Sequence, residues 1–308
     1  MNLEKEKNFV SAVVYVHNNE KQLSKFIERI YEQLKNHFLK FEIICVDDNS
    51  TDNSMTVLKE NSQLNDGVIS IVKMSFHQGL ELSMNAGVDL SIGDFVFEFD
   101  SIAEEIPVEK MMEAYYKSLQ GYDIVSVSPN RDAGLDSRLF YDIFNAYSNK
   151  NYTLHTECYH VISRRAINRC QSLSKTIPYR KAVYIDCGLK IANIKLDFAL
   201  QNSEENLDKR LNTAVDALIL FTSAATKINL YIIAFFILIC IAVVIYVLFV
   251  YLSGKPVSGW TTTMLFISFG FLSVFVVLAV IMKYLSVIIH LIFKNKTYIT
   301  ESIEKLGK

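Results

Sequence analysis

The chain has 308 residues, of which 51% are hydrophobic, and its mean hydropathy is +0.21. This is too apolar for an ordinary water-soluble domain of that length, so part of the chain is expected to contact lipid. The formal net charge of −2 gives no overall basic surface, which argues against nucleic acid as the main partner. The five cysteines include no Cys-x-x-Cys pair, which favours reduced thiols over a disulfide framework.

The first hundred residues alternate apolar, strand-like runs with segments in which apolar residues recur at helical spacing. Four strands are expected, at residues 9–16, 41–46, 68–74 and 94–99. Helices between them predict an α/β domain with a mostly parallel central sheet that is covered on both faces. A helix near residues 108–119, a strand near 123–127 and a helix near 139–147 are expected to follow.

Polar residues stand at the end of each of the first four strands. Because the carboxyl ends of parallel strands meet at one edge of a sheet, these residues are expected where α/β sheets bind ligands. No GxGxxG motif follows the first strand and no GxxxxGK[ST] motif is present, so the dinucleotide and P-loop fingerprints are absent. An acidic turn alone is usually only a turn or a helix cap. Several polar strand ends together favour a site for a ribose, a base or a metal-bound diphosphate.

Two uncharged apolar segments lie towards the C-terminus, at residues 228–253 and 261–282. Each reaches the roughly 20 residues that a helix needs to cross a bilayer. An amphipathic helix on the membrane surface is expected just before them, at residues 201–227. Lysines flank the pair at its outer ends, so the positive-inside rule predicts that both termini are cytosolic. The domain at residues 1–200 and a C-terminal tail at 283–308 would then both lie in the cytosol.

Four stretches of the first domain resemble the successive blocks of the family 2 glycosyltransferases with the GT-A fold: residues 10–20, 42–52, 93–94 and 99–100. Later stretches are similar to landmarks of one branch of that family, at residues 139–141, 163–166, 221–223, 259–260, 283–285 and 298–299. That branch carries two C-terminal membrane helices and moves a sugar from a nucleotide to a polyprenyl phosphate. The bactoprenol glucosyltransferases and dolichol-phosphate mannosyltransferases belong to it. The resemblance covers nearly the whole chain.

The resemblance implies a site for a nucleotide-diphosphate sugar in the loops after the first three strands. The residues that it implies there are Tyr15, His17, Glu20, Asp47, Asp48, Gln78 and Gly79. It also implies that Asp100 is a catalytic and metal-binding acid, that Arg131 is catalytic, and that Arg131 and Arg138 face the acceptor phosphate. Guanidinium groups suit the last role because they fork onto phosphate oxygens and stabilise a departing diphosphate.

Two positions depart from the family pattern. The family usually reads Asp-x-Asp after the fourth strand, but here the second position is Ile102, which cannot coordinate a metal. Glu105 could instead complete a site for Mg²⁺ or Mn²⁺ together with Asp100. Cys158 stands where the branch tends to carry an acid that orients or activates the acceptor. Its neighbour Glu157 is therefore the candidate for that catalytic role.

The leading hypothesis is a multi-pass enzyme of the cytoplasmic (inner) membrane that modifies cell-envelope polysaccharide. It would transfer a hexose from a nucleotide-diphosphate sugar to a polyprenyl phosphate of the undecaprenyl type at the inner leaflet. One alternative is a catalytically degenerate membrane scaffold, supported by Ile102 and Cys158. Another is an active transferase whose acceptor is a glycolipid or a wall polymer. Membrane-anchored relatives often form homo-oligomers, so a homo-oligomer is a further expectation.

Overall fold

The computed structural model describes residues 4–64, 69–130, 142, 156–173, 179–198, 224–254, 259–293 and 298–306. The chain divides into two compact units. The first comprises residues 1–145, 149–206 and 293–308, and the second comprises residues 146–148 and 207–292. The N-terminal domain and the membrane-length segments predicted from the sequence therefore fall in different units.

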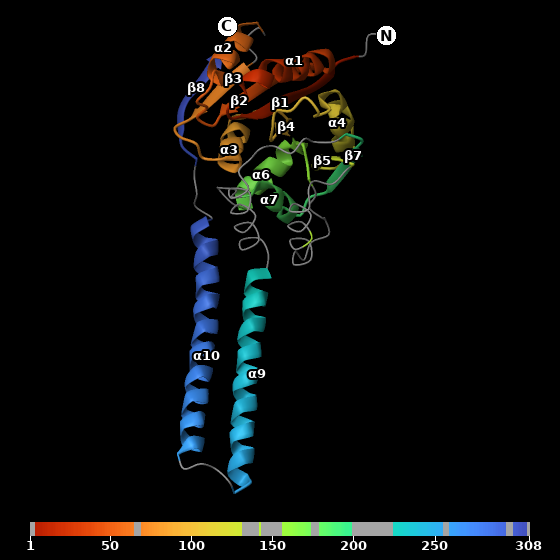
Figure 1. The fold of residues 1–308 in the computed structure, drawn as a ribbon. Helices are drawn as coiled ribbons and strands as arrows, with labels where there is room; N and C mark the ends of the chain where they lie inside the picture. Colours follow the sequence, from red (N-terminus) through yellow and green to blue (C-terminus); the bar gives the residue numbers. More distant parts are fainter. Residues whose placement is uncertain are drawn as a thin grey trace. The chain divides into compact units, whose positions relative to one another are not determined.

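The first unit is built on an eight-stranded sheet with the order β7-β5-β6-β4-β1-β2-β3-β8 (Figure 1). Its strands are β1 (Glu6–Val16), β2 (Phe38–Asp47), β3 (Ile69–Met74), β4 (Phe95–Phe99), β5 (Ile124–Pro129), β6 (Tyr159–Ser163), β7 (Ile191–Leu196) and β8 (Thr300–Leu306). The four N-terminal strands pair in parallel, whereas β6 and β8 run antiparallel to their neighbours. The expected mostly parallel sheet is confirmed.

Helices cover both faces of this sheet. They are α1 (Glu20–His37), α2 (Ser54–Leu64), α3 (Leu80–Leu90), the 3-10 turn η1 (Val108–Lys110), α4 (Met111–Leu119), α6 (Arg164–Leu173) and α7 (Arg180–Asp186). Alternate residues of β1, such as Val10 and Val14, belong to one core with buried residues of α1 and α4. Val13, which immediately precedes Val14, faces α3 on the other side of the sheet. A Cβ on Gly87 of α3 would lie 2.4 Å from Val13 Cγ1, so glycine allows α3 to pack closely on β1.

The C-terminal residues add a strand that the sequence analysis did not predict. Residues 283–308 were expected to form a tail, but α10 continues to Phe293 and β8 pairs with β3 at the edge of the sheet. Ion pairs accompany this pairing, with Lys73 Nζ 2.8 Å from Glu301 and Lys59 Nζ 3.2 Å from Glu304. Only two residues of the strand, Ile303 and Leu306, are apolar, and they are three positions apart, so its sequence lacks the apolar alternation that identifies strands.

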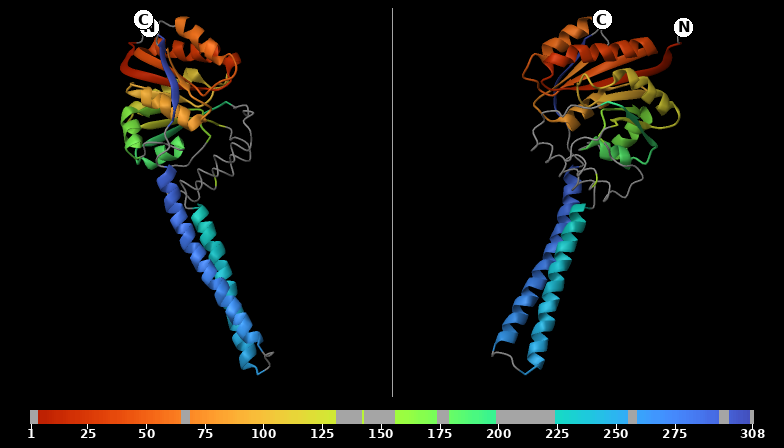
Figure 2. Two further views of the ribbon diagram at one scale, coloured as in Figure 1. Left: turned by 90° about the vertical axis from the view of Figure 1, so that its left-hand side faces the viewer. Right: turned by 45° about the vertical axis from the view of Figure 1, so that its right-hand side comes forward.

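The second unit contains two long apolar helices, α9 (Ala224–Leu252) and α10 (Trp260–Phe293), which lie side by side (Figure 2). Within them, Leu230–Leu252 and Thr262–Leu285 are long and apolar enough to cross a membrane. Large apolar side chains, such as those of Phe249 and Phe266, are exposed along both helices. Such a surface is stable against lipid rather than water. Helices of sufficient length and apolar character are present where the two spans were expected, whereas the predicted surface helix lies almost wholly outside the described residues.

Candidate active site

The loops that follow β1, β2 and β3 meet around the buried carboxylate of Asp48. The backbone N–H of Gln78 donates to Asp48 Oδ1 at 2.7 Å, and that of Gly79 donates to Oδ2 at 2.8 Å. The Tyr15 hydroxyl donates to Oδ2 at 3.0 Å. Gly79 has a φ of +89°, a conformation that favours glycine, and it begins α3. Asp48 therefore fixes the loop before α3 through two backbone donors and binds β1 through the Tyr15 hydroxyl.

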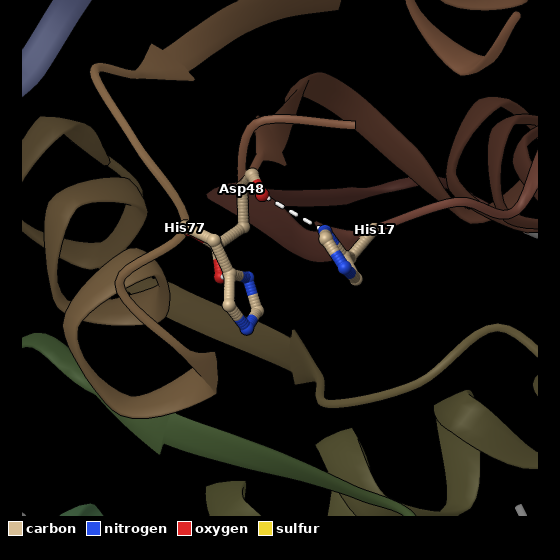
Figure 3. Close-up of side chains that lie close together, drawn as sticks. All are labelled: His17, Asp48 and His77. Atoms are coloured by element: carbon tan, nitrogen blue, oxygen red, sulfur yellow. Dashed lines mark hydrogen bonds and ion pairs between the residues drawn. The ribbon is translucent and has the colours of Figure 1, made fainter. Parts of the chain in front are cut away.

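Two histidines lie beside Asp48 (Figure 3). His17 Nδ1 lies 2.9 Å from the backbone oxygen of Asp48, and His77 Nδ1 lies 3.0 Å from its Oδ2. Their rings stack with centroids 4.3 Å apart, and the side chain of His77 is 36% exposed. The sequence analysis named His17 but not His77, although His77 adjoins the predicted Gln78 and Gly79. We call this group the Asp48 cluster: Tyr15, His17, Asp48, His77, Gln78 and Gly79.

Glu20 and Asp47 lie at the same edge of the sheet and bind the protein itself. Glu20 Oε2 accepts hydrogen bonds of 3.0 Å from both the backbone and the side chain of Asn53. Asp47 accepts the Ser50 N–H at 3.3 Å, and burial raises the pKa of its carboxyl group. These contacts join the loop after β1 to the turn before α2. Direct contacts of Glu20 and Asp47 with a nucleotide remain predictions.

A second group of charged residues surrounds Asp100, which directly follows β4. Arg180, at the start of α7, is only 1% exposed and pairs with Asp100 through Nη2. Its Nε lies 3.1 Å from Glu81 Oε2, and its Nη1 lies 3.4 Å from Glu98 Oε2. The Tyr184 hydroxyl donates to the other oxygen of Glu98 at 2.7 Å. One buried guanidinium thus contacts acidic side chains from α3, β4 and the loop after β4.

Lys181 and Glu157 extend this group. Lys181 Nζ lies 3.6 Å from Asp100 Oδ2 and 3.8 Å from Glu157 Oε2. His160 Nε2 lies 2.6 Å from the same oxygen of Glu157. The side chains of Glu157, His160 and Lys181 also line a small cavity. We call the whole group the Arg180 network: Glu81, Glu98, Asp100, Glu157, His160, Arg180, Lys181 and Tyr184.

Burial and ion pairing act in opposite directions on the acids of the network. Burial would raise the pKa of Asp100, but Arg180 and Lys181 outweigh it and lower that pKa to about 2. Burial likewise opposes ionisation of Glu157, yet His160 and Lys181 lower its pKa below the ordinary value. Glu98 differs because burial prevails and raises its pKa despite Arg180. Asp100 and Glu157 are therefore ionised at neutral pH.

The predicted metal pair of Asp100 and Glu105 remains a prediction, and the residues around Asp100 do not fit a metal ion. One carboxylate oxygen of Asp100 bonds Arg180, and the other faces Lys181. Ile102 is buried in the apolar core and supplies no oxygen ligand. Within the described part of the chain, the one group of three residues with suitable ligand atoms and spacing is His17, Asp48 and His77. That group could hold a divalent ion, whose identity is not determined.

Of the remaining predicted residues, two lie in the described part of the chain and two lie outside it. Glu157 lies in the Arg180 network, whereas Cys158 is buried in the apolar core, which raises the pKa of its thiol to about 12. Cys158 therefore offers no acid to that network, and the catalytic role of Glu157 remains a prediction. Arg131 and Arg138 lie outside the described residues.

Sequence reasoning missed most of the Arg180 network. Glu98 carried a readable signal, because an acid in the middle of a buried strand requires a partner. Arg180 and Lys181 carried none, since no motif surrounds them and they come from a short helix far along the chain.

Solved structures with a similar fold are glycosyltransferases. Glucosyl-3-phosphoglycerate synthase from Mycobacterium tuberculosis aligns with a TM-score of 0.52 at 17% identity, over 69% of this chain and 78% of that one. A mannosyltransferase from Pyrobaculum calidifontis, in complex with GDP-Man and Mn²⁺, aligns with a TM-score of 0.50 at 14% identity, over 70% and 63% of the two chains. The fold is that of the GT-A glycosyltransferases.

The sequence comparisons agree with the fold. The model of the glycosyl transferase family 2 matches residues 11–175. An uncharacterized glycosyltransferase of Synechocystis is 24% identical over 84% of each chain. An undecaprenyl-phosphate 4-deoxy-4-formamido-L-arabinose transferase of Pectobacterium atrosepticum is 28% identical over 71% of this chain and 69% of that protein. This chain belongs to the glycosyl transferase family 2 and is a glycosyltransferase.

Proposed function

We propose that this chain transfers a hexose from a nucleotide-diphosphate sugar to a polyprenyl phosphate at the cytosolic face of the inner membrane. The observation that carries the proposal is the combination of a GT-A domain with two membrane-length helices in one chain. A water-soluble acceptor would not require such helices. Relatives that match over about 70% of their length are named undecaprenyl-phosphate transferases, which supports a lipid phosphate as the acceptor.

The nucleotide-sugar donor would bind at the edge of the sheet where the Asp48 cluster and the Arg180 network lie. The strand register sets Asp47 level with Val16 on one side of β1, and Phe99 level with Val14 on the other. The backbones at Asp48 and Asp100 are therefore about 12 Å apart, two strand spacings across the sheet and two residues along it, which is within the span of a nucleoside diphosphate. The stacked rings of His17 and His77 offer a flat surface to a base, and the diphosphate would extend towards Asp100.

The reaction needs little acid–base catalysis. An oxygen of the acceptor phosphate is already anionic, so it can attack the anomeric carbon directly while the bond to the donor's diphosphate breaks. The nucleoside diphosphate leaves with the bonding electron pair, and positive groups stabilise its added charge. We assign that role to cations beside Asp100, with Arg131 and Arg138 as predicted contributors. Glu157 would orient the acceptor, and positioning would supply most of the remaining rate enhancement.

A product assay tests this function. The full-length protein, purified in detergent, is incubated with a panel of nucleotide sugars and undecaprenyl phosphate, and the lipid fraction is analysed by mass spectrometry. We expect one lipid-linked hexose that does not form when undecaprenol without phosphate replaces the acceptor. Sugar transfer only to a glycolipid or a wall polymer would contradict the proposed acceptor. Absence of transfer from every donor, by protein that still binds nucleotide, would favour the scaffold alternative.

A further inference from the structure

Lys181 lies between two acids at the edge of the Arg180 network. Its ammonium group is 3.6 Å from Asp100 Oδ2 and 3.8 Å from Glu157 Oε2. Both distances lie within ion-pair range, so attraction of opposite charge acts between Lys181 and each of the two carboxylates. Its side chain is 13% exposed. A positive charge therefore already stands between Asp100 and Glu157.

Arg180 leaves little room for a metal ion at Asp100. Its buried guanidinium bonds one oxygen of Asp100 and is itself held by Glu81 and Glu98. A Mg²⁺ ion requires near-octahedral oxygen ligands at about 2.0–2.1 Å and must avoid neighbouring positive charge. Ile102, at the position where the resemblance leads one to expect a second acid, is packed in the apolar core. Asp100 is thus the counter-ion of two side-chain cations.

We propose that Lys181, with Arg180 behind it, replaces a divalent cation at Asp100 and contacts the diphosphate of the donor. The donor class rests on the proposed function. A bound diphosphate draws the Lys181 ammonium group from its place between the carboxylates onto a phosphate oxygen. Arg180 stays with Asp100 and keeps that acid neutralised during the movement. Binding of a nucleoside diphosphate by this chain consequently requires no metal ion at Asp100.

Calorimetric titration of the full-length protein with UDP, GDP, CDP and dTDP tests the inference. Each titration is made in excess EDTA and again with Mn²⁺. We expect one nucleotide to bind in EDTA, with an affinity that Mn²⁺ changes by less than about threefold. Binding that is lost in EDTA and restored by Mn²⁺, both in the wild type and in a His77→Ala variant that lacks one ligand of the His17, Asp48 and His77 group, would overturn the inference.

Substitutions at Lys181 test the same point by a second route. Lys181→Met should weaken nucleotide binding in EDTA by about tenfold to a hundredfold, because a charge-assisted hydrogen bond is lost. Lys181→Arg keeps the charge and should retain most of the affinity. The exposed Lys190, four residues beyond α7, provides the matched control, and Lys190→Met should bind as the wild type does. Unchanged binding by Lys181→Met would overturn the inference.

The fold of each variant is checked by thermal unfolding before titration. If Lys181→Met does not fold, the EDTA titration of the wild type still decides the question. The two proposals fail in different ways. Metal-dependent nucleotide binding removes the role of Lys181 and leaves lipid-linked transfer intact. Metal-free binding without any lipid-linked product contradicts the proposed acceptor alone.

Discussion

The Asp48 cluster and the Arg180 network lie at the same edge of one sheet but are stabilised in different ways. In the Asp48 cluster a single carboxylate is satisfied by backbone N–H groups, a tyrosine hydroxyl and a histidine ring, and the histidines reach the surface. In the Arg180 network several full charges are buried against one another. The comparison indicates that the first region can change its ligand contacts at little cost to folding. If the second binds the donor as proposed above, it couples ligand binding to the stability of the domain.

The largest expected effect comes from removing the central cation of the network. Arg180→Met leaves Glu81, Glu98 and Asp100 without their shared partner, and breaking a buried ion pair in this way costs about 3–5 kcal/mol. Chemical denaturation of the full-length protein in detergent measures this loss. Lys25→Met provides the control, because it breaks an exposed pair with Glu104 and should leave stability unchanged. Equal stability of the two variants would show that the network does not support the fold.

A smaller effect is expected on acidification. The pKa of Asp100 is about 2 in the folded protein, against about 3.9 in an unfolded chain. This depression contributes about 2 kcal/mol of stability, which is complete above about pH 5 and is lost as the pH falls towards 2. Denaturant midpoints between pH 7 and pH 3 should therefore decrease.

Two variants show whether Asp100 causes that decrease. Asp100→Asn lowers stability at neutral pH and should flatten the profile, because its amide does not titrate in this range. The exposed Asp197→Asn should keep the wild-type profile. A profile of Asp100→Asn as steep as that of the wild type would assign the acid sensitivity to other groups.

The smallest expected effect concerns the Asp48 cluster. His77→Ala removes one face of the stacked pair and one partner of Asp48, which retains the N–H groups of Gln78 and Gly79. Nucleotide affinity should fall by about twofold to tenfold, with little change in stability. Calorimetry and thermal unfolding measure the two quantities. His37→Ala at the end of α1 is the control and should alter neither. A large loss of stability in His77→Ala would remove the contrast between the two regions.

The N-terminal half of the fold could be predicted because its information is local. Apolar runs that end in polar residues, such as the run before Asp48, identify a strand, its end and its functional edge together. The same locality identified the two apolar helices. Prediction failed for β8, which has only two apolar residues and pairs with β3, a strand far away in the sequence. Pairing partners that are distant in the sequence leave no periodic signal.

In the candidate site, too, the residues in local sequence patterns were predicted, and the contacts between distant parts of the chain were not. The loops that were predicted to bind the donor contain short runs of polar residues next to strands, and Tyr15, His17, Asp48, Gln78 and Gly79 do converge. Contacts of Asp100 depend instead on Arg180 and Lys181, which are some 80 residues away in the chain. The identity of Ile102 indicated that a metal ligand was absent. It could not indicate that a guanidinium group and an ammonium group would stand beside Asp100.

The most direct test of the account is the transfer of a radiolabelled hexose by the full-length protein in lipid nanodiscs. The best donor from the panel is supplied with either undecaprenyl phosphate or undecaprenol, and label in the organic phase is counted. We predict label with the phosphate and background counts with the alcohol. Equal counts from the two acceptors, or label recovered only in a water-soluble product, would contradict transfer to a lipid phosphate.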